Sequence, residues 1–168
     1  MIQKKVCMLG AFAVGKTSLV RRFVHSMFAD KYLTTVGVKI DKKQLTHSGK
    51  EVLLLLWDLY GEDEFQRVQT TYLRGSSGLF LVADGTRPDT VEKAIELRDK
   101  ALASLGNVPH VLLMNKCDLS PQWEVRPERL RQLTQSGWQI QRTSAKTGEG
   151  VEQAFASLTE QMLGGIPK

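Results

Sequence analysis

The sequence has little cysteine. Only two of its 168 residues are cysteines, and Cys7 and Cys117 lie too far apart to show the spacing of a metal site. This scarcity argues against a disulfide-stapled secreted domain. We expect two free thiols in a reducing compartment.

Long apolar runs are also missing. The longest run, residues 52–57, is far too short to cross a bilayer. The first residues, Met-Ile-Gln-Lys-Lys, do not form a signal-peptide pattern. We therefore expect a cytoplasmic protein without a transmembrane segment.

Dense charge runs are absent as well. The formal net charge is +5, but the basic residues fall in small scattered clusters such as Lys4 with Lys5. They lack the aromatic interleaving of a single-strand binder, so no nucleic-acid partner is expected. The overall composition, with 42% hydrophobic and 24% charged residues, is that of a globular protein. The length predicts one domain over residues 1–168.

Apolar segments alternate with helical patterns along the chain. Residues 52–57, 78–84 and 110–115 read as buried strands, and residues 38–46 read as an outer strand paired to the first of these through a turn at 47–50. Later segments predict a loop over 121–127, a helix from Pro127 to about Gln135, a short strand from Trp138 and a final helix. The alternation predicts a mostly parallel sheet with helices on both faces.

One motif joins the first strand pattern to the first helix pattern. Residues 10–18, Gly-Ala-Phe-Ala-Val-Gly-Lys-Thr-Ser, fit the spacing G-x-x-x-x-G-K-[ST]. Such a loop turns backbone N–H groups toward phosphate, with Lys16 against the β- and γ-phosphates and the Thr17 hydroxyl on Mg²⁺. The alternative, a glycine turn with a chance lysine, does not explain the strand before it and the helix after it. The expected phosphate-binding residues are Gly10, Ala13, Val14, Gly15, Lys16, Thr17 and Ser18.

Other polar residues follow strands in the same way. Asp58, Asn115 and Thr143 all fall at the carboxyl ends of predicted strands, as Gly10 does. In an open parallel sheet, ligands bind at that edge.

Together these motifs resemble those of small GTPases of the Ras superfamily, most nearly the Rab type, over almost the whole chain. The matching segments, in family order, are residues 10–17, Thr-Val-Gly at 35–37, Trp-Asp-Leu-Tyr-Gly at 57–61, Asn-Lys-Cys-Asp at 115–118 and Thr-Ser-Ala-Lys at 143–146. The resemblance implies a three-layer P-loop NTPase G domain, an α/β fold whose six-stranded, mostly parallel sheet has one antiparallel edge strand. It also implies GTP or GDP as ligand, with Mg²⁺.

The resemblance assigns guanine recognition to the last two motifs. A carboxylate at the Watson–Crick edge of guanine can accept from N1–H and the 2-amino group, which adenine lacks, and Asp118 takes this role. Asn115 would tie the base-binding loops and contact N7, while Lys116 would lie along the purine and ribose. The Ala145 N–H would donate to O6, with Ser144 and Lys146 supporting the loop. Taken alone, Asn115 and Asp118 would read as a solvated loop.

Further residues gain roles by the same resemblance. Phe28 would pack edge-on against the base, although it also reads as a core residue at a helix end, and Tyr32 would cover the phosphates. Thr35 would reach Mg²⁺ only with the γ-phosphate present, Asp58 would hold Mg²⁺ through water, and the Gly61 N–H would meet the γ-phosphate. Loss of that phosphate would release the loops at 28–37 and 58–72, which report the nucleotide state to partners.

Three residues depart from the family pattern. Glu62 stands where most members have a glutamine that orients water, and a carboxylate there cannot donate and repels the γ-phosphate. Phe12, in a position that is usually small, would exclude a partner's arginine finger, and Tyr60 also replaces a small residue. The expected catalytic residues are Glu62, Lys16, Thr35 and Gly61, with slow hydrolysis.

The carboxyl-terminal residues also differ, because no cysteine follows the last helix pattern and no lipidation site is visible. Two explanations stay open: a removed tail, or a soluble, bacterial-type member.

The sequence leaves three functions to consider for this protein. The first is a monomeric, Mg²⁺-dependent GTP/GDP switch that binds effectors, exchange factors and GTPase-activating factors. The second is a nucleotide-binding interaction module with negligible turnover, favoured by Glu62, Phe12 and Tyr60. The third, a P-loop ATPase or kinase, leaves residues 115–118 unexplained.

Overall fold

The computed structural model describes residues 1–25, 38–59 and 71–164. The helix expected around Phe65, Val68 and Tyr72 falls largely outside these ranges; residues 71–73 are helical. Among the described residues, no helix has both the length and the apolar character needed to cross a membrane.

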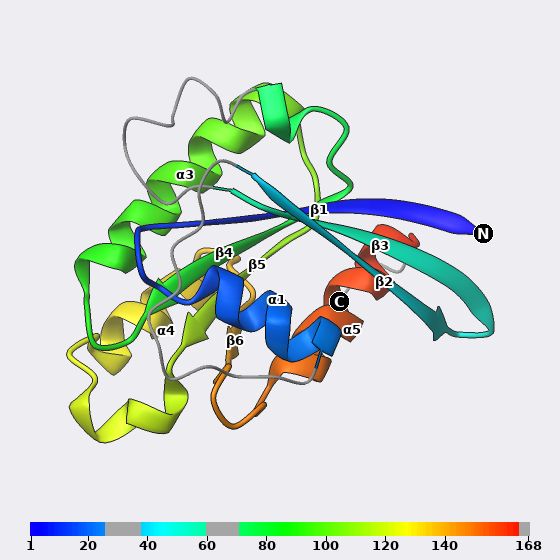
Figure 1. Cartoon of the computed structure of the whole chain (residues 1–168). Coiled ribbons are helices and arrows are strands. Elements are labelled where there is room, and N and C mark those ends of the chain that lie inside the picture. The colour runs from blue at the N-terminus through cyan, green and yellow to red at the C-terminus, as the bar shows by residue number, and fades with distance from the viewer. Residues whose placement is uncertain (26–37, 60–70, 165–168) are drawn as a thin grey trace.

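In the described ranges, six strands form one sheet, in the order β2-β3-β1-β4-β5-β6. Neighbouring strands run parallel except at one edge, where β2 pairs antiparallel with β3 through a tight turn. This confirms the mostly parallel sheet with one antiparallel edge strand (Figure 1). The strands are β1 Ile2–Gly10, β2 Lys39–His47, β3 Lys50–Asp58, β4 Gly78–Asp84, β5 His110–Asn115 and β6 Ile140–Arg142.

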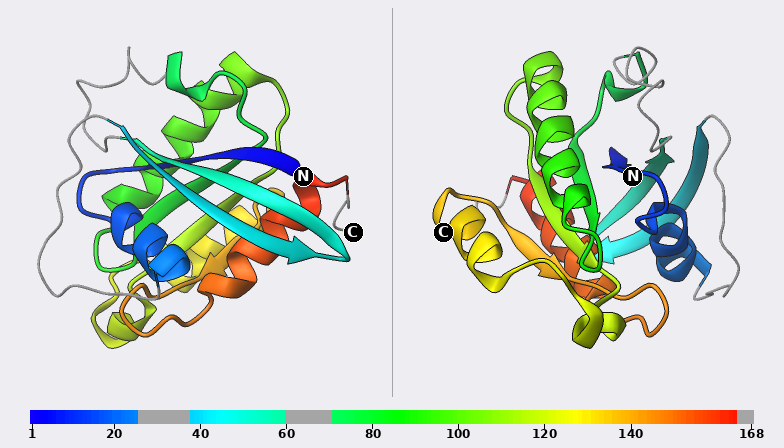
Figure 2. Two further views of the ribbon diagram at one scale, coloured as in Figure 1. Left: turned by 45° about the vertical axis from the view of Figure 1, so that its right-hand side comes forward. Right: turned by 90° about the vertical axis from the view of Figure 1, so that its left-hand side faces the viewer.

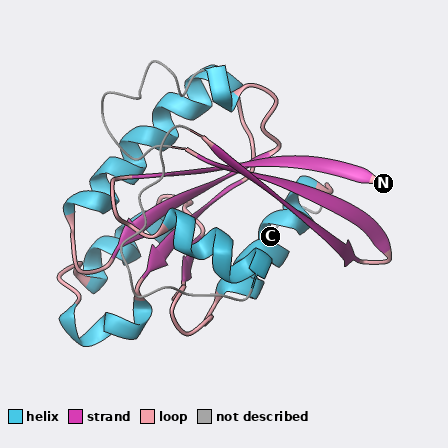
Figure 3. Cartoon of the chain, viewed as in Figure 1, coloured by secondary structure: helices cyan, strands magenta, loops and turns pink. Residues whose placement is uncertain are grey.

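Helices cover both faces of the sheet, as the alternating pattern predicts (Figures 2 and 3). α1 and α5 pack on one face and α3 and α4 on the other. A short 3₁₀ helix, η2, follows β5. The helices are α1 Lys16–His25, α3 Asp89–Leu105, η2 Cys117–Gln122, α4 Pro127–Gln135 and α5 Val151–Met162.

The sheet has a hydrophobic core on each face, because its side chains alternate between the two faces and helices cover both. Every residue of β4 is buried, and successive side chains point to opposite faces. Phe80 and Val82 join the core beneath α1 and α5, whereas Leu79, Leu81 and Ala83 join the core beneath α3 and α4. This explains why β4 is continuously apolar in sequence.

Two local expectations were wrong. The loop expected over 121–127 begins later, because η2 extends to Gln122 and includes Pro121. The last strand begins at Ile140 instead of Trp138. Trp138 packs into the core beneath α3 and α4, with 5% of its surface exposed, and its N–H donates to the Leu133 carbonyl at the end of α4. Trp138 therefore packs in the core and lies before β6, not in it.

The packing of Phe155 generates a stability prediction. Its ring stacks on Phe23 with centroids 3.8 Å apart, meets Phe80 edge-on at 4.8 Å, and is 2% exposed. We expect Phe155→Ala to lower the free energy of unfolding by about 3–5 kcal/mol, measured by denaturant titration. Ile40→Ala, at a side chain 48% exposed, is the control and should change it by no more than about 0.5 kcal/mol. A loss below about 1 kcal/mol for Phe155→Ala would contradict this packing.

Candidate functional site

The candidate site lies where the carboxyl ends of four neighbouring strands meet. β1 ends at Gly10, β3 at Asp58, β4 at Asp84 and β5 at Asn115. These strands are adjacent and parallel. The structure thus brings together the residues that the sequence placed at this edge.

In the loop between β1 and α1, two positions must be glycine because neighbouring atoms leave no room for a Cβ. A Cβ on Gly10 would lie 2.5 Å from the Val82 carbonyl oxygen, and a Cβ on Gly15 would overlap the Asn115 amide. Gly15 also has φ +102°, in the region that side chains disfavour. Ala13 adopts a positive φ of 63° as well, which sharpens the turn. The loop is therefore folded tightly against β4 and β5.

The loop leads directly into α1. The Leu19 N–H donates to the Gly15 carbonyl at 2.9 Å, closing the first turn of the helix. The preceding amides, those of Lys16 to Ser18, belong to the helix end whose N–H groups have no intrahelical acceptor. Such an end attracts anions, since the helix dipole places partial positive charge there.

Lys16 is buried at the mouth of this loop. Its side chain is 7% exposed, and its Nζ lies 3.3 Å from the Gly10 carbonyl oxygen and 3.5 Å from that of Ala11. Burial lowers the pKa of Lys16, and the nearby Asp58 carboxylate offsets part of this effect. Within residues 1–25, 38–59 and 71–164, no carboxylate forms an ion pair with it. A buried ammonium that contacts only neutral carbonyls suits an anionic ligand.

Thr17 and Asp58 meet beside Lys16. The Thr17 hydroxyl donates to Asp58 Oδ2, and Asp58 is 1% exposed. A hydroxyl and a carboxylate side by side are oxygen donors of the kind Mg²⁺ prefers. These two residues fit the predicted cation, and Thr17 would bind it directly.

Asn115 connects three segments. Its side chain is 2% exposed. Its Nδ2 donates to the Val14 carbonyl at 2.9 Å, and its Oδ1 accepts from the Thr143 hydroxyl at 3.1 Å. This amide therefore ties the glycine-rich loop to the segment after β6.

Asp118 and Ser144 form the outer part of the site. The Ser144 hydroxyl donates to Asp118 Oδ1 at 2.8 Å and accepts from the Thr147 N–H at 3.1 Å. Arg22 of α1 holds the same loop, because its guanidinium donates to the carbonyls of Ala145, at 2.7 Å, and Lys146. The two predicted base-binding segments are thus joined to each other and to α1.

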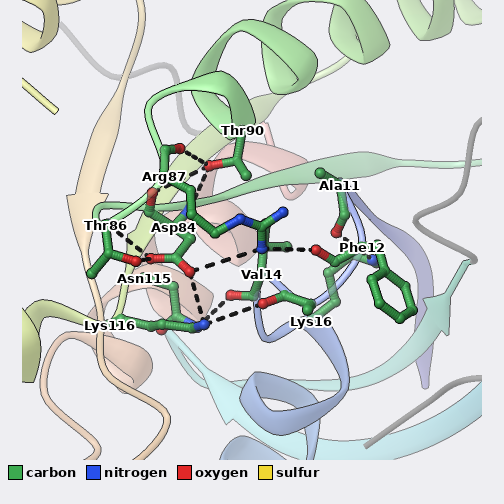
Figure 4. Close-up of polar contacts among 11 residues, drawn as sticks. Ala11, Phe12, Val14, Lys16, Asp84, Thr86, Arg87, Thr90, Asn115 and Lys116 are labelled. Atoms are coloured by element: carbon green, nitrogen blue, oxygen red, sulfur yellow. Dashed lines mark hydrogen bonds and ion pairs between the residues drawn. The ribbon is translucent and has the colours of Figure 1, made fainter. Parts of the chain in front are cut away.

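Lys116 lies between the two halves of the site (Figure 4). Its backbone is left-handed, with φ 67°. Its Nζ donates to the Ala13 carbonyl at 3.2 Å and lies 2.8 Å from Asp84 Oδ2. The aliphatic stem therefore runs from β5 to the glycine-rich loop.

Sequence reasoning missed Asp84 as a site residue. Burial raises the pKa of its carboxyl, but hydrogen bonds from Lys116 and Thr86 and the Lys116 charge outweigh burial and leave that pKa lowered. A signal was available, since Asp84 ends an apolar strand just as Asp58 does.

The sequence also gave no role to Arg87. Its guanidinium donates to the Phe12 carbonyl at 2.9 Å, while the Phe12 side chain is 44% exposed and points away from the pair of Asp84 and Lys116 (Figure 4). Nothing in the spacing of the sequence signalled this contact.

Several predicted residues lie outside the described residues. They are the base-packing phenylalanine, the threonine expected to sense the γ-phosphate, the tyrosine expected to cover the phosphates and three residues tied to hydrolysis: Phe28, Thr35, Tyr32, Tyr60, Gly61 and Glu62. Of the loops at 28–37 and 58–72, only residues 58, 59, 71 and 72 are described.

Comparison with known proteins gives a consistent result. The model of the Ras family matches residues 5–164. The Ras-related protein Rab-13 of Canis lupus familiaris is 34% identical over 95% of this chain and 79% of its own length. Ras-related protein Rab-32C of Dictyostelium discoideum is 33% identical over 96% of this chain and 74% of its own, and Rab-21 of Mus musculus is 35% identical over 95% and 72%. The chain therefore belongs to the Ras family, as a Rab-like, GTP-binding small GTPase.

Proposed function

We propose that this protein is a molecular switch that binds GTP or GDP with Mg²⁺, hydrolyses GTP slowly, and presents residues 28–37 and 58–72 to partners in the GTP state. Residues 1–168 act as one G domain in this proposal. The expected partners are effectors and, for resetting, exchange or GTPase-activating factors. We also propose that it works as a monomer in the cytoplasm, in keeping with its two free cysteines.

The environment of Lys16 is the observation that carries the proposal. Its ammonium is nearly fully buried beside the amino end of α1, against two carbonyl oxygens. A polyphosphate would supply the counter-charge that these neutral groups lack, and the amides of Ala13 to Ser18 would donate to it. This accounts for the burial of a charged residue that contributes little to the core.

The outer segments favour guanine as the base. Ser144 holds one oxygen of Asp118, which fixes a carboxylate just beyond the end of β5, where the base would lie. A carboxylate can accept from both guanine donors and is repelled by the acceptor N1 of adenine. Ala145 and Lys146, whose carbonyls are held by Arg22, would keep the Ala145 N–H directed at O6.

Bound Mg²⁺ would neutralise charge on the phosphates and order the ligands around them. Thr17 supplies a hydroxyl for it, and Asp58 would act through water. Thr35 and the Gly61 N–H would sense the γ-phosphate. Since they belong to two different loops, loss of that phosphate would release both.

Two residues, Glu62 and Phe12, are the reasons for proposing slow GTP hydrolysis. Glu62 would accept a hydrogen bond from water but would repel the γ-phosphate, and the transition state depends mainly on positioning and charge stabilisation. The exposed Phe12 ring supports this, because an arginine from a partner would have to pass it. The second candidate, a nucleotide-binding interaction module with negligible turnover, is favoured by the same ring together with Glu62 and Tyr60.

Base preference provides the first test. We expect GTP to displace a labelled GDP at concentrations at least ~10²-fold lower than ATP, since one carboxylate pairs with both guanine donors. Asp118→Ala should remove most of this preference in a competition titration. Asp99→Ala, on the exposed surface of α3, is the matched control and should keep it. Equal affinity for GTP and ATP in the native protein would rule out the guanine assignment.

Lys16 provides a test that separates binding from stability. We expect Lys16→Met to abolish nucleotide binding, yet to raise the free energy of unfolding of the nucleotide-free protein by about 1–2 kcal/mol, because burying the ammonium costs free energy. Denaturant titration and GDP binding measure the two effects.

The pH dependence has a defined sign. The folded pKa of Lys16 is lowered, so the unfolded state binds more protons between that pKa and the unfolded value of about 10.4. The stability gap between Lys16→Met and the native protein is therefore full at any pH below the folded pKa of Lys16, and it shrinks as the pH rises from that pKa toward the unfolded value. If Lys16→Met is less stable than the native nucleotide-free protein, burial of the Lys16 ammonium does not cost the free energy that we assign to it.

Single-turnover hydrolysis of pre-bound GTP tests the slow rate. We expect little phosphate release by the native protein and faster release by Glu62→Gln, because an amide can orient water without adding negative charge. Glu64→Gln is a control on the same segment. Steady hydrolysis by the native protein, unchanged in Glu62→Gln, would refute the role given to Glu62 and leave the switch standing.

A further inference from the structure

Trp123 fills a space that Gly85 leaves open beside the site. A Cβ on Gly85 would overlap the indole ring of Trp123 at Cε2, Cδ2 and Nε1. Gly85 is not among the described glycines with a positive φ. The absence of a side chain at residue 85 therefore serves the approach of the ring and not the backbone conformation.

The same ring makes a hydrogen bond to Lys116. The indole Nε1–H donates to the Lys116 carbonyl at 2.9 Å, and the Leu119 N–H donates to this oxygen at 2.9 Å as well. Lys116 has φ 67° and ψ 38°, a left-handed conformation that is unfavourable for a residue with a Cβ. Neighbouring contacts must hold such a residue in place.

Contacts of the neighbouring backbone and of Arg142 hold the indole ring of Trp123 in place. The amides of Glu124 and Val125, which follow Trp123, donate to the Gly85 carbonyl at 3.0 and 3.2 Å, and the Gly85 N–H donates to the Asn115 carbonyl at 3.3 Å. The Arg142 guanidinium lies 4.7 Å from the centre of the indole ring. The indole is thus held between the ends of β4, β5 and β6.

Lys116 is consequently held at both of its ends. Trp123 holds its carbonyl, whereas Asp84 and the Ala13 carbonyl hold its ammonium. Asp84 is itself fixed by the N–H and the hydroxyl of Thr86, at 2.9 and 2.8 Å (Figure 4). Residues at the end of β4 and just after η2 therefore hold Lys116 at its two ends.

We propose that Trp123, seated over Gly85, is a positioning residue that holds Lys116 in its left-handed conformation and thereby slows nucleotide release. The inference rests on the proposed function, in which Lys116 lies along the purine and ribose. Nucleotide departs when the base-binding segment opens. Because the indole N–H stabilises the closed backbone of Lys116, its loss should speed opening.

The rate of GDP dissociation from the Mg²⁺-loaded protein is the measurement. Labelled GDP is chased with excess unlabelled GDP, and thermal unfolding of each variant is recorded alongside. Trp123→Phe keeps an aromatic ring over Gly85 but removes the N–H donor. We therefore expect GDP to dissociate about five-fold faster, which corresponds to the net contribution of one hydrogen bond. Trp138→Phe is the matched control, since Trp138 is buried beneath α3 and α4 and packs on Arg98. It should change the release rate less than about twofold, whatever its effect on thermal stability.

A double-mutant cycle tests the pairing with Gly85. Gly85→Ala should speed GDP release when Trp123 is present, because the added methyl displaces the ring. It should have little effect in a Trp123→Ala background, where the space is open. Non-additivity of this kind is the signature of direct coupling. Gly85→Ala also carries the test alone if Trp123→Phe does not fold.

The outcomes separate the two proposals. Faster release in Trp123→Phe and Gly85→Ala, with Trp138→Phe unchanged, supports the positioning role. Equal release from the native protein and both variants, all of which bind GDP, overturns it and leaves the switch function intact. Additive effects in the cycle, or equal acceleration by Trp138→Phe, also overturn it. A native protein that binds no GDP overturns the proposed function and this inference together.

Discussion

One buried amide connects the parts of this site. Asn115 donates to the glycine-rich loop at Val14 and accepts from Thr143 after β6, so the carboxyl ends of β1, β5 and β6 are bound to one side chain. Gly15 has no Cβ because the Asn115 amide occupies that space. The tight loop and the segment after β6 therefore share one geometric constraint, since moving either of them would break a hydrogen bond of this amide.

Two buried charged residues near that amide differ in whether another charged side chain pairs with them. Asp84 is paired with the Lys116 ammonium, and its pKa is lowered despite burial. Among the described residues, the hydrogen bonds of Lys16 go to carbonyl oxygens, and burial lowers its pKa although the nearby Asp58 carboxylate offsets part of this effect. The first pair is electrostatically complete among the described residues, whereas in the proposed function a ligand's negative charge would complete the second. On that proposal Asp84 shapes the site and Lys16 binds in it.

Much of the fold was predictable because its patterns are local. The apolar run of β4, the glycine-rich loop and the proline at the start of α4 each indicate one conformation over a few residues. The boundaries of β4 and β5 agree with the sequence analysis, and the edge hairpin is antiparallel as expected. One error occurred where a distant contact competes with local preference, because Trp138 leaves the last strand to fill the core beneath α3 and α4. The other was local, because η2 extends to Gln122 and includes Pro121, which the sequence analysis assigned to a loop.

The sequence by itself determined the class of fold and the residues that would meet at one edge of the sheet, because motif spacing and strand alternation are properties of the chain. Only the tertiary structure decided how these residues are held. Asp84 against Lys116, Arg87 on the Phe12 carbonyl, Arg22 on the loop after β6 and Trp123 over Gly85 all join segments distant in sequence. No periodicity encodes such pairs, since they depend on which side chains the packing of helices and strands brings within hydrogen-bonding distance.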